Sequence, residues 1–304
     1  MDTEQRSYFL VVNLIAGLGL CKRLFPKVRK ELDRRGISYD LHYTNEPQEA
    51  IDVARMGVDA GFSHVVAMGG DGTINEVANG LGDGAATLGV IPAGTGNDFA
   101  RMMGLPIDPI KAIDVLESGV VRTIDQGVLN GERRFVNGMG IGIDAQVARD
   151  VLQARRLTGP PAYVSAAIRE VFRFKAFPAL VETEEWSEQS RWLSVGVANG
   201  KYCGGGFKLA PRAEVNDGRL DLAAIGDFPR IERLMRLVQA RKGKHLGLRK
   251  VRYVQARKVS ISSDQKLVAH MDGEPYRLPK ERFTVEALPD SLSVLVPRAV
   301  AASR

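Results

Sequence analysis

The N-terminal half of the chain alternates short apolar runs with segments whose apolar residues recur at helical spacing. The apolar runs predict strands, and the periodic segments predict helices. Strands are expected at residues 8–12, 39–43, 65–68 and 88–91, and helices at 25–35, 47–57 and 74–81. Such alternation is typical of a parallel, doubly wound α/β sheet.

From about residue 124 the pattern changes to short alternating runs separated by turns. We expect strands at 123–129, 133–136, 180–183, 193–198, 220–225, 259–262, 267–271 and 283–287, interrupted by two helices at 161–174 and 231–240. This spacing is typical of an antiparallel β-sandwich. The change predicts an α/β domain over residues 1–124 and a β-sandwich domain over 125–287, a division that 304 residues favour.

Composition agrees with two packed domains. Hydrophobic residues make up 44% of the chain, yet no uncharged run approaches the roughly 20 apolar residues that span a bilayer. The polar start, residues 1–6, lacks the layout of a signal peptide, so we expect a cytoplasmic protein or one peripheral to the inner membrane face. Two cysteines, Cys21 and Cys203, indicate neither a disulfide framework nor a metal cluster.

A first glycine-rich loop, residues 69–73, joins the strand at 65–68 to the helix at 74–81. Gly69, Gly70 and Gly72 remove side chains that would keep a phosphate from the backbone N–H groups, and the helix dipole favours negative charge there. Alone, this motif is equally consistent with a tight strand-to-helix turn in which Thr73 is the N-cap.

A second loop follows the strand at 88–91 and contains Gly94, Thr95, Asn97 and Asp98. Neighbouring parallel strands would bring both loops to one carboxyl edge of the sheet, where α/β folds bind ligands. Asp71 and Asp98 would then lie beside the phosphates. Because carboxylates and phosphates repel each other, a divalent cation is required between the two acids and the phosphates. These features favour ATP with Mg²⁺, held without a Walker motif, which the sequence lacks.

Both loops resemble the catalytic domain of the diacylglycerol kinase superfamily, in particular its soluble bacterial lipid kinases; sphingosine and ceramide kinases are more distant relatives. The resemblance continues, in the family's order, through residues 124–127, 135–145, 197–207, 210–213, 216–221 and 272–274. It implies an ATP- and Mg²⁺-dependent lipid kinase whose active site lies in the cleft between the two domains. It also implies that a last strand near 292–296 returns, so that residues 288–304 rejoin the first domain.

The resemblance also implies which residues form the site. The nucleotide-binding set is Asn13, Thr44, Gly69, Gly70, Asp71, Gly72, Thr73, Asn75, Gly94, Thr95, Asn97, Asp98 and Asp125. Within it, Asp71, Asp98 and Asp125 match the acids that bind magnesium or phosphate through water. Leu14 stands where the family's first loop commonly has proline.

A structural magnesium is implied at residues 214–219, held by the Asp217 carboxylate and by the backbone carbonyls of Glu214 and Arg219. Asn216-Asp217-Gly218 is by itself a strong hairpin signal, and such a turn needs no metal.

The catalytic residues are expected to be Asp71 and Glu274. Asp272-Gly273-Glu274 follows the strand at 267–271, and Gly273 would let the turn direct a carboxylate inward. Alone, Asp-Gly-Glu is a common hairpin turn; its likeness to the family's base motif favours Glu274 as the group that accepts the proton of the acceptor hydroxyl.

The acceptor should be a lipid with a free hydroxyl, such as diacylglycerol. The net charge is +6, and residues 230–258 contain 11 Lys or Arg against one acid, Glu232. Such a basic face favours the anionic cytoplasmic leaflet. The helix at 231–238 carries an apolar stripe that is equally consistent with packing on the sandwich. An exposed sandwich edge would also allow a homodimer.

Three other functions are consistent with parts of the pattern. An NAD kinase-like phosphotransferase also uses Gly-Gly-Asp-Gly-Thr, but the second loop and residues 272–274 count against it. The sequence pI of 9.3 suggests nucleic-acid binding, yet 36 residues are acidic and no recognition motif appears, so no nucleic acid is expected. A catalytically silent nucleotide sensor conflicts with the intact Asp71, Asp98 and Glu274.

Overall fold

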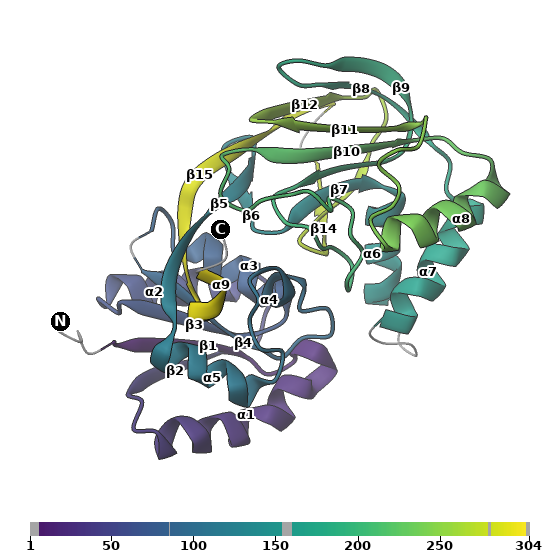
Figure 1. Ribbon diagram of the computed structural model, residues 1–304. Helices are drawn as coiled ribbons and strands as arrows, with labels where there is room; N and C mark the ends of the chain where they lie inside the picture. Colours follow the sequence, from purple (N-terminus) through teal and green to yellow (C-terminus); the bar gives the residue numbers. More distant parts are fainter. Residues whose placement is uncertain (1–5, 85, 154–159, 279–280, 302–304) are drawn as a thin grey trace. The chain divides into compact units, whose positions relative to one another are not determined.

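The computed structural model describes residues 6–84, 86–153, 160–278 and 281–301. The polar N-terminal residues 1–5, on which the absence of a signal peptide was inferred, lie outside this range. The chain forms two compact units: residues 1–124 with 290–304, and residues 125–289. Strands β5 (Val120–Leu129) and β15 (Arg282–Val296) each run from one unit into the other (Figure 1).

The first unit is a parallel sheet in the order β15-β4-β3-β1-β2. Helices α1 and α5 lie on one side of these strands, and α2 and α3 on the other (Figure 1). The bounds are β1 Tyr8–Asn13, α1 Ala16–Arg34, β2 Tyr39–Thr44, α2 Glu49–Asp59, β3 His64–Gly69, α3 Asp71–Gly80, β4 Thr87–Pro92, α4 Asp98–Met102, α5 Pro109–Ser118 and α9 Arg298–Ala301. The doubly wound α/β fold is therefore confirmed.

Helix α3 begins earlier than the apolar spacing predicted. Its N-cap is Gly70, so Thr73 lies inside the first turn and the interpretation of Thr73 as N-cap is wrong. The buried residues Ile74, Val77 and Ala78 occupy the expected face. Because a Cβ on Gly69 would lie 2.4 Å from the Thr73 Oγ1, only glycine fits beside this turn.

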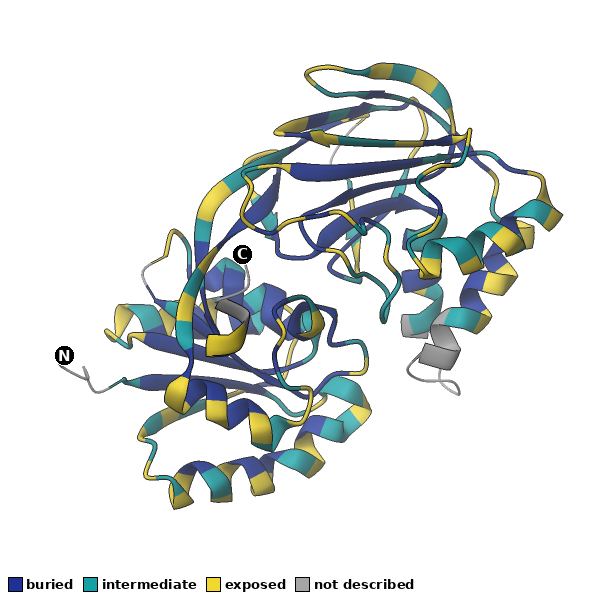
Figure 2. Cartoon of the chain, in the orientation of Figure 1, coloured by how far each residue is buried: buried dark blue, intermediate teal, exposed yellow. Residues whose placement is uncertain are grey.

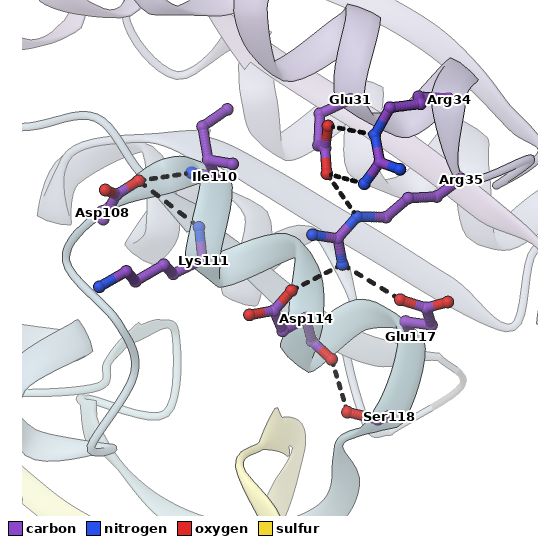
Figure 3. A network of polar contacts seen from close by, with 9 residues as sticks. All are labelled: Glu31, Arg34, Arg35, Asp108, Ile110, Lys111, Asp114, Glu117 and Ser118. Atoms are coloured by element: carbon purple, nitrogen blue, oxygen red, sulfur yellow. Dashed lines mark hydrogen bonds and ion pairs between the residues drawn. The ribbon is translucent and has the colours of Figure 1, made fainter.

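Helix α5 was not predicted, although the sequence contains its start signal. The Asp108 carboxylate accepts hydrogen bonds from the N–H groups of Ile110 and Lys111, and Pro109 follows the cap. Arg35, at the end of α1, forms ion pairs with Glu31 on its own helix and with Asp114 and Glu117 on α5 (Figure 3). These pairs join the two helices on one side of the sheet.

The second unit is an antiparallel sandwich, as predicted, whose core is lined by Trp192, Phe135 and Phe283. Its further strands are β6 Arg133–Phe135, β7 Gly138–Gly142, β8 Phe177–Glu182, β9 Ser187–Ala198, β10 Leu220–Gly226, β11 Val251–Ala256, β12 Lys258–Ser262, β13 Val268–Met271 and β14 Glu274–Arg277. Residues 283–287 and 292–296, expected as two strands, belong to the single long strand β15.

Within the described part of this unit, three helices, not two, accompany the sandwich: α6 (Ile143–Gln153), α7 (Pro160–Arg173) and α8 (Arg230–Arg241). The expectation of only two is wrong, because α6 was missed. Ile143, Val147 and Val151 of α6 pack in one cluster with Ala167 of α7 and Leu237 of α8. None of the described helices combines the length and apolar character needed to cross a bilayer.

Candidate active site

The ends of four parallel strands place several of the expected nucleotide residues along one edge of the first unit. Asn13, the last residue of β1, is the register partner of Thr44, the last residue of β2. Gly69, at the end of β3, is likewise opposite Pro92, at the end of β4. The prediction that both glycine loops leave neighbouring parallel strands is therefore confirmed.

The two glycine loops are in direct contact. A Cβ on Gly94 would lie 2.5 Å from the Gly70 Cα, so the backbones approach more closely than any side chain allows. The Phe99 N–H donates to the Asp71 Oδ1 at 2.9 Å, which fixes the first carboxylate against the second loop. The loops thus form one structure that carries both Asp71 and Asp98.

The loop after β1 joins this structure. The Asn13 Nδ2 donates to the Thr73 Oγ1 at 3.1 Å, and a Cβ on Gly17 would lie 2.5 Å from the Ala93 carbonyl oxygen. Gly17, Leu18 and Gly19 all have left-handed φ angles, of 60°, 58° and 81°. Three successive left-handed residues explain why two of these positions are glycine, and they interrupt the start of α1.

Burial differs among the loop residues. Asn97 and Asp98 are buried, Asp71 and Gly72 are half-buried, and Thr95 is exposed. The Asn97 side chain both accepts from the Gly94 N–H and donates to the Gly94 carbonyl, at 3.0 Å each, so it shapes the loop. Its φ of 51° lies in the left-handed region that asparagine tolerates.

Asn75 lies deeper in α3, where its carbonyl and side-chain oxygens accept from the Asn79 amide. Thr44 is buried as well, with 3% of its surface exposed. Both residues lie in the first unit with the glycine loops, and their part in nucleotide binding stays a prediction.

The edge is suited to a phosphate with a divalent cation. No side chain caps α3, so its first-turn N–H groups and helix dipole suit phosphate oxygens. Among the described residues no group of three His, Cys, Asp or Glu forms a ready metal site. A magnesium ion beside Asp71 and Asp98 would therefore take most ligands from phosphate and water, as Mg²⁺ commonly does.

The contact between the loops is testable with Gly94→Ala. The added methyl group should force the loops apart and destabilise the first unit by about 1–3 kcal/mol, the usual cost of overpacking, while weakening ATP binding. Denaturant unfolding and calorimetric titration with ATP measure the two effects. Gly247→Ala is the control, because a Cβ there meets nothing within 4 Å; equal behaviour of the two variants would contradict the role of the contact.

The other expected site residues lie in the second unit. Asp125 on β5 is 1% exposed; its carboxylate accepts from the Gly218 N–H at 2.7 Å, and its own N–H donates to the Val215 carbonyl. Asp125 therefore holds the loop at 214–219, for which the structural magnesium was predicted. Its role toward the nucleotide stays a prediction.

The loop at 214–219 contains two carboxylates, Glu214 and Asp217, of which Asp217 is the predicted metal ligand. The Asp217 oxygens accept from the Arg219 N–H at 3.0 Å and the Gln255 amide at 3.1 Å, and the Glu214 and Arg219 side chains are exposed. Burial raises the pKa of the nearby Asp221 carboxyl, and the charges of Asp217 and Glu214 add to that shift. A cation would have to be held by Asp217 with backbone carbonyls and water, a ligand set that Mg²⁺ accepts.

Glu274 is exposed and is the first residue of β14, directly after the turn from β13. Asp272, with φ of 47°, and Gly273, with φ of 90°, form this turn. The Asp272 carboxylate accepts three hydrogen bonds, from the N–H groups of residues 136, 137 and 138, at 2.8–2.9 Å. Asp272 thus anchors the turn, and Glu274 projects from a fixed support.

A residue that sequence reasoning missed, Asn199, links these parts. It is fully buried, and its side-chain amide donates to the carbonyls of Asp125 and Val136 at 2.8 and 2.9 Å. Its own N–H donates to the Asn137 carbonyl. One buried amide therefore connects the strand of Asp125 with the segment that holds Asp272. Asn199 lies in a stretch that carried the resemblance, but its spacing alone indicates no partner.

Comparison with known proteins finds a family model that matches each of the two units. The model of the diacylglycerol kinase catalytic domain matches residues 7–129, and that of the YegS C-terminal NAD kinase beta sandwich-like domain matches residues 137–296. A diacylglycerol kinase of Bacillus subtilis is 32% identical over 269 residues, which cover 87% of this chain and 88% of that protein. A Pseudomonas aeruginosa protein named probable lipid kinase YegS-like is 32% identical over 265 residues, which cover 84% of this chain and 84% of that protein.

Solved structures share the fold over nearly the whole chain. A candidate diacylglycerol kinase of Bacillus anthracis has a TM-score of 0.81 at 25% identity and covers 99% of this chain and 100% of its own. An NAD kinase of Archaeoglobus fulgidus in complex with ATP has a TM-score of 0.56 at 14% identity, covering 97% and 95%, which shows a common fold alone. The chain belongs to the diacylglycerol kinase-like family of ATP-dependent bacterial lipid kinases.

Proposed function

We propose that this enzyme transfers the γ-phosphoryl group of ATP to the hydroxyl of diacylglycerol, giving phosphatidic acid, in the cleft between its two units. The observation that carries the proposal is the contact of the two glycine loops at Gly70 and Gly94, which unites Asp71 and Asp98 beside an uncapped helix. The likeness to a diacylglycerol kinase supports the choice of acceptor.

The chain's own residues would act by positioning and by electrostatics. Bound ATP with Mg²⁺ supplies the phosphoryl group and the cationic charge that offsets its oxygens. The N–H groups at the start of α3 would bind phosphate oxygens, and Asp71 with Asp98 would hold the magnesium through its water ligands. Asn13, Thr44, Asn75 and Asp125 complete the proposed nucleotide set.

Glu274 would orient the lipid hydroxyl and accept its proton late in the transfer. An ordinary carboxylate is a weak base for an alcohol, so positioning matters more than basicity. The anchoring of its turn by Asp272 supports this role, because a fixed support keeps the carboxylate in one geometry. In the second unit, Asp217 with the carbonyls of Glu214 and Arg219 would hold a structural magnesium.

Incubation with γ-labelled ATP, Mg²⁺ and a panel of lipid alcohols tests the proposal. The panel contains diacylglycerol, phosphatidylglycerol, a sphingoid base and an undecaprenyl-like alcohol, with NAD as a separate acceptor. Label should appear in phosphatidic acid and depend on Mg²⁺. Label in another lipid would overturn the choice of diacylglycerol, and label in NAD alone would replace the lipid kinase by the NAD kinase-like alternative.

We further propose that helix α8 binds an anionic membrane at the inner face. Three of the four residues in its predicted apolar stripe are exposed: Ile231 at 79%, Met235 at 58% and Val238 at 57%. Most of this helix has the colours of intermediate and exposed residues in Figure 2. The helix instead packs inward through Arg233 and Leu237. Exposed basic residues accompany the stripe: Arg230, Arg241, Lys242, Lys244, Arg249 and Lys250. Apolar groups flanked by cations suit a bilayer with anionic lipids.

Replacing Ile231, Met235 and Val238 together by serine should reduce binding to phosphatidylglycerol-containing vesicles by at least about 10-fold, because the lost apolar area contributes to insertion. Sedimentation with vesicles measures the effect. Met56→Ser is the control, since Met56 is similarly exposed, at 54%, on helix α2 of the other unit. If the triple variant binds these vesicles as well as the parent protein does, helix α8 is not the membrane contact.

A further inference from the structure

The second unit contains a cavity between strand β9 and helices α6, α7 and α8. Side chains alternate along these strands, and Met139, Ile141 and Val195 enter the sandwich core. The opposite face carries Gly140 and Gly196, which are register partners. Other side chains take the space over these two glycines, Asp144 and His270 over Gly140 and Leu209 over Gly196, and these three residues line the cavity.

The cavity is mainly apolar and lies within the second unit. The volume that the centres of water molecules reach is about 150 Å³, roughly ten times what one water requires on this measure. Apolar residues from all three helices line it, among them Val147, Ala167 and Leu237. This is room for about ten water-sized groups, the scale of a hydrocarbon chain.

Polar side chains interrupt the apolar lining: Arg233 and Arg236, whose guanidinium groups are held by hydrogen bonds within the unit, and Asp144, Ser194 and His270. The Ser194 hydroxyl, 3% exposed, and the Asp144 Oδ2 have no hydrogen-bond partner among the described residues. The His270 Nδ1 accepts from the Gly273 N–H at 3.3 Å, which assigns the ring proton to Nε2. That Nε2 is 3.7 Å from the Asp144 Oδ2, too far for a hydrogen bond.

Gly140 is what allows Asp144 and His270 to approach. A Cβ on Gly140 would lie 2.1 Å from the Asp144 Oδ2 and 2.4 Å from the His270 Nε2. The pair therefore offers an acceptor and a donor side by side in an apolar space. A hydroxyl group, which donates and accepts, would satisfy both atoms, and an ester oxygen, which only accepts, would satisfy the His270 Nε2–H.

We propose that this cavity holds one hydrocarbon chain of the lipid substrate, and that Asp144, Ser194 and His270 bind the hydroxyl or ester group beside that chain. The inference rests on the proposed function and adds a binding site to it. Gly273 lines the cavity and directly precedes Glu274. A lipid held there has its polar end next to the turn that carries the proposed base.

Binding of 1-monoacylglycerols, from butanoyl to dodecanoyl, tests the site by calorimetry below their micelle concentrations and without ATP. Affinity should rise about fourfold for each added CH₂ group until the cavity is full, and then level off. Ala167→Phe fills the cavity and should bring the plateau to a shorter chain. Ser165→Phe is the matched control, since Ser165 is exposed on the same helix.

Two further variants keep the test decisive if Ala167→Phe fails to fold. Leu237→Ala enlarges the cavity and should extend the plateau to longer chains. Ser194→Ala should lower the affinity for every monoacylglycerol while leaving the increment per CH₂ unchanged, because it alters only the polar contact. Affinity that is independent of chain length, or a plateau unmoved in Leu237→Ala, would overturn the assignment.

The outcome separates this site from the proposed kinase activity. If monoacylglycerols bind with an affinity that depends on chain length but no lipid receives label, the cavity is a binding site and the proposed kinase function is wrong. If Leu237→Ala transfers phosphate to diacylglycerol with an unchanged preference for chain length, the kinase activity stands, but the cavity is not its lipid site.

Discussion

Glu274→Gln should reduce phosphoryl transfer to the lipid by about 10²–10⁴-fold, the range that a positioned general base contributes. Affinity for ATP and the unfolding midpoint should stay close to those of the parent protein. Glutamine keeps the length and the hydrogen-bonding shape of the side chain but cannot accept a proton. Steady-state kinetics with ATP and diacylglycerol, together with ATP titration, measure the two effects.

The structure makes this variant informative because the turn before Glu274 is anchored by another residue. Asp272 does so, with three accepted N–H bonds, while Glu274 is exposed on the first position of β14. A substitution of Asp272 would lower the stability of the protein as well as its turnover, because it removes a carboxylate that accepts hydrogen bonds from three N–H groups. The two effects could not be separated. Glu274→Gln avoids that confusion.

Glu185→Gln is the matched control, because Glu185 is an exposed glutamate in the same unit, between β8 and β9. It should leave turnover unchanged. Equal turnover of Glu274→Gln and the parent protein would exclude Glu274 as the base, and loss of ATP affinity together with turnover would indicate a structural role instead.

The glycine loops were predictable because their signals are local. Apolar strands before Gly69 and Gly94, and the rule that neighbouring parallel strands end at one edge, indicated a shared site. The register of β3 with β4 bears this out. What the sequence did not indicate is how closely the loops approach, since the contact of Gly70 with Gly94 depends on the packing of two whole strands.

Strand β7 and helix α6 escaped prediction for a related reason. Gly138, Gly140 and Gly142 have low strand propensity and resemble a loop in sequence, yet they are paired on both sides by β9 and β13. The glycines are needed there because Asp144 and His270 occupy the space above Gly140. Tertiary packing thus outweighed local propensity at the position where a binding site is proposed.

The long-range hydrogen bonds of the second unit lay beyond sequence reasoning altogether. Asn199 bonds to residues 74 and 63 positions away, and Asp272 to residues 134–136 positions away. Spacing and periodicity report neighbours within one element, so they indicate no such partners. The likeness to a family marked these residues as significant without revealing what they contact.

Asp71→Asn should lower phosphoryl transfer by about 10²-fold or more, because it removes a charge that supports the cation at the transferring group. The concentration of Mg²⁺ needed for half-maximal activity should rise. Stability should change little, since the asparagine carbonyl can still accept from the Phe99 N–H. Magnesium titrations of initial rate and denaturant unfolding measure the effects.

Asp71→Ala separates the charge from the hydrogen bond. It loses both, so it should show the same catalytic defect and, in addition, a loss of about 0.5–1.5 kcal/mol in the free energy of unfolding. Asp52→Asn is the control for removing a negative charge near a helix N-terminus, because Asp52 is an exposed acid in the first turn of α2. A magnesium requirement that is unchanged in Asp71→Asn would show that Asp71 only joins the two loops, and the cation would then have to be assigned to other groups.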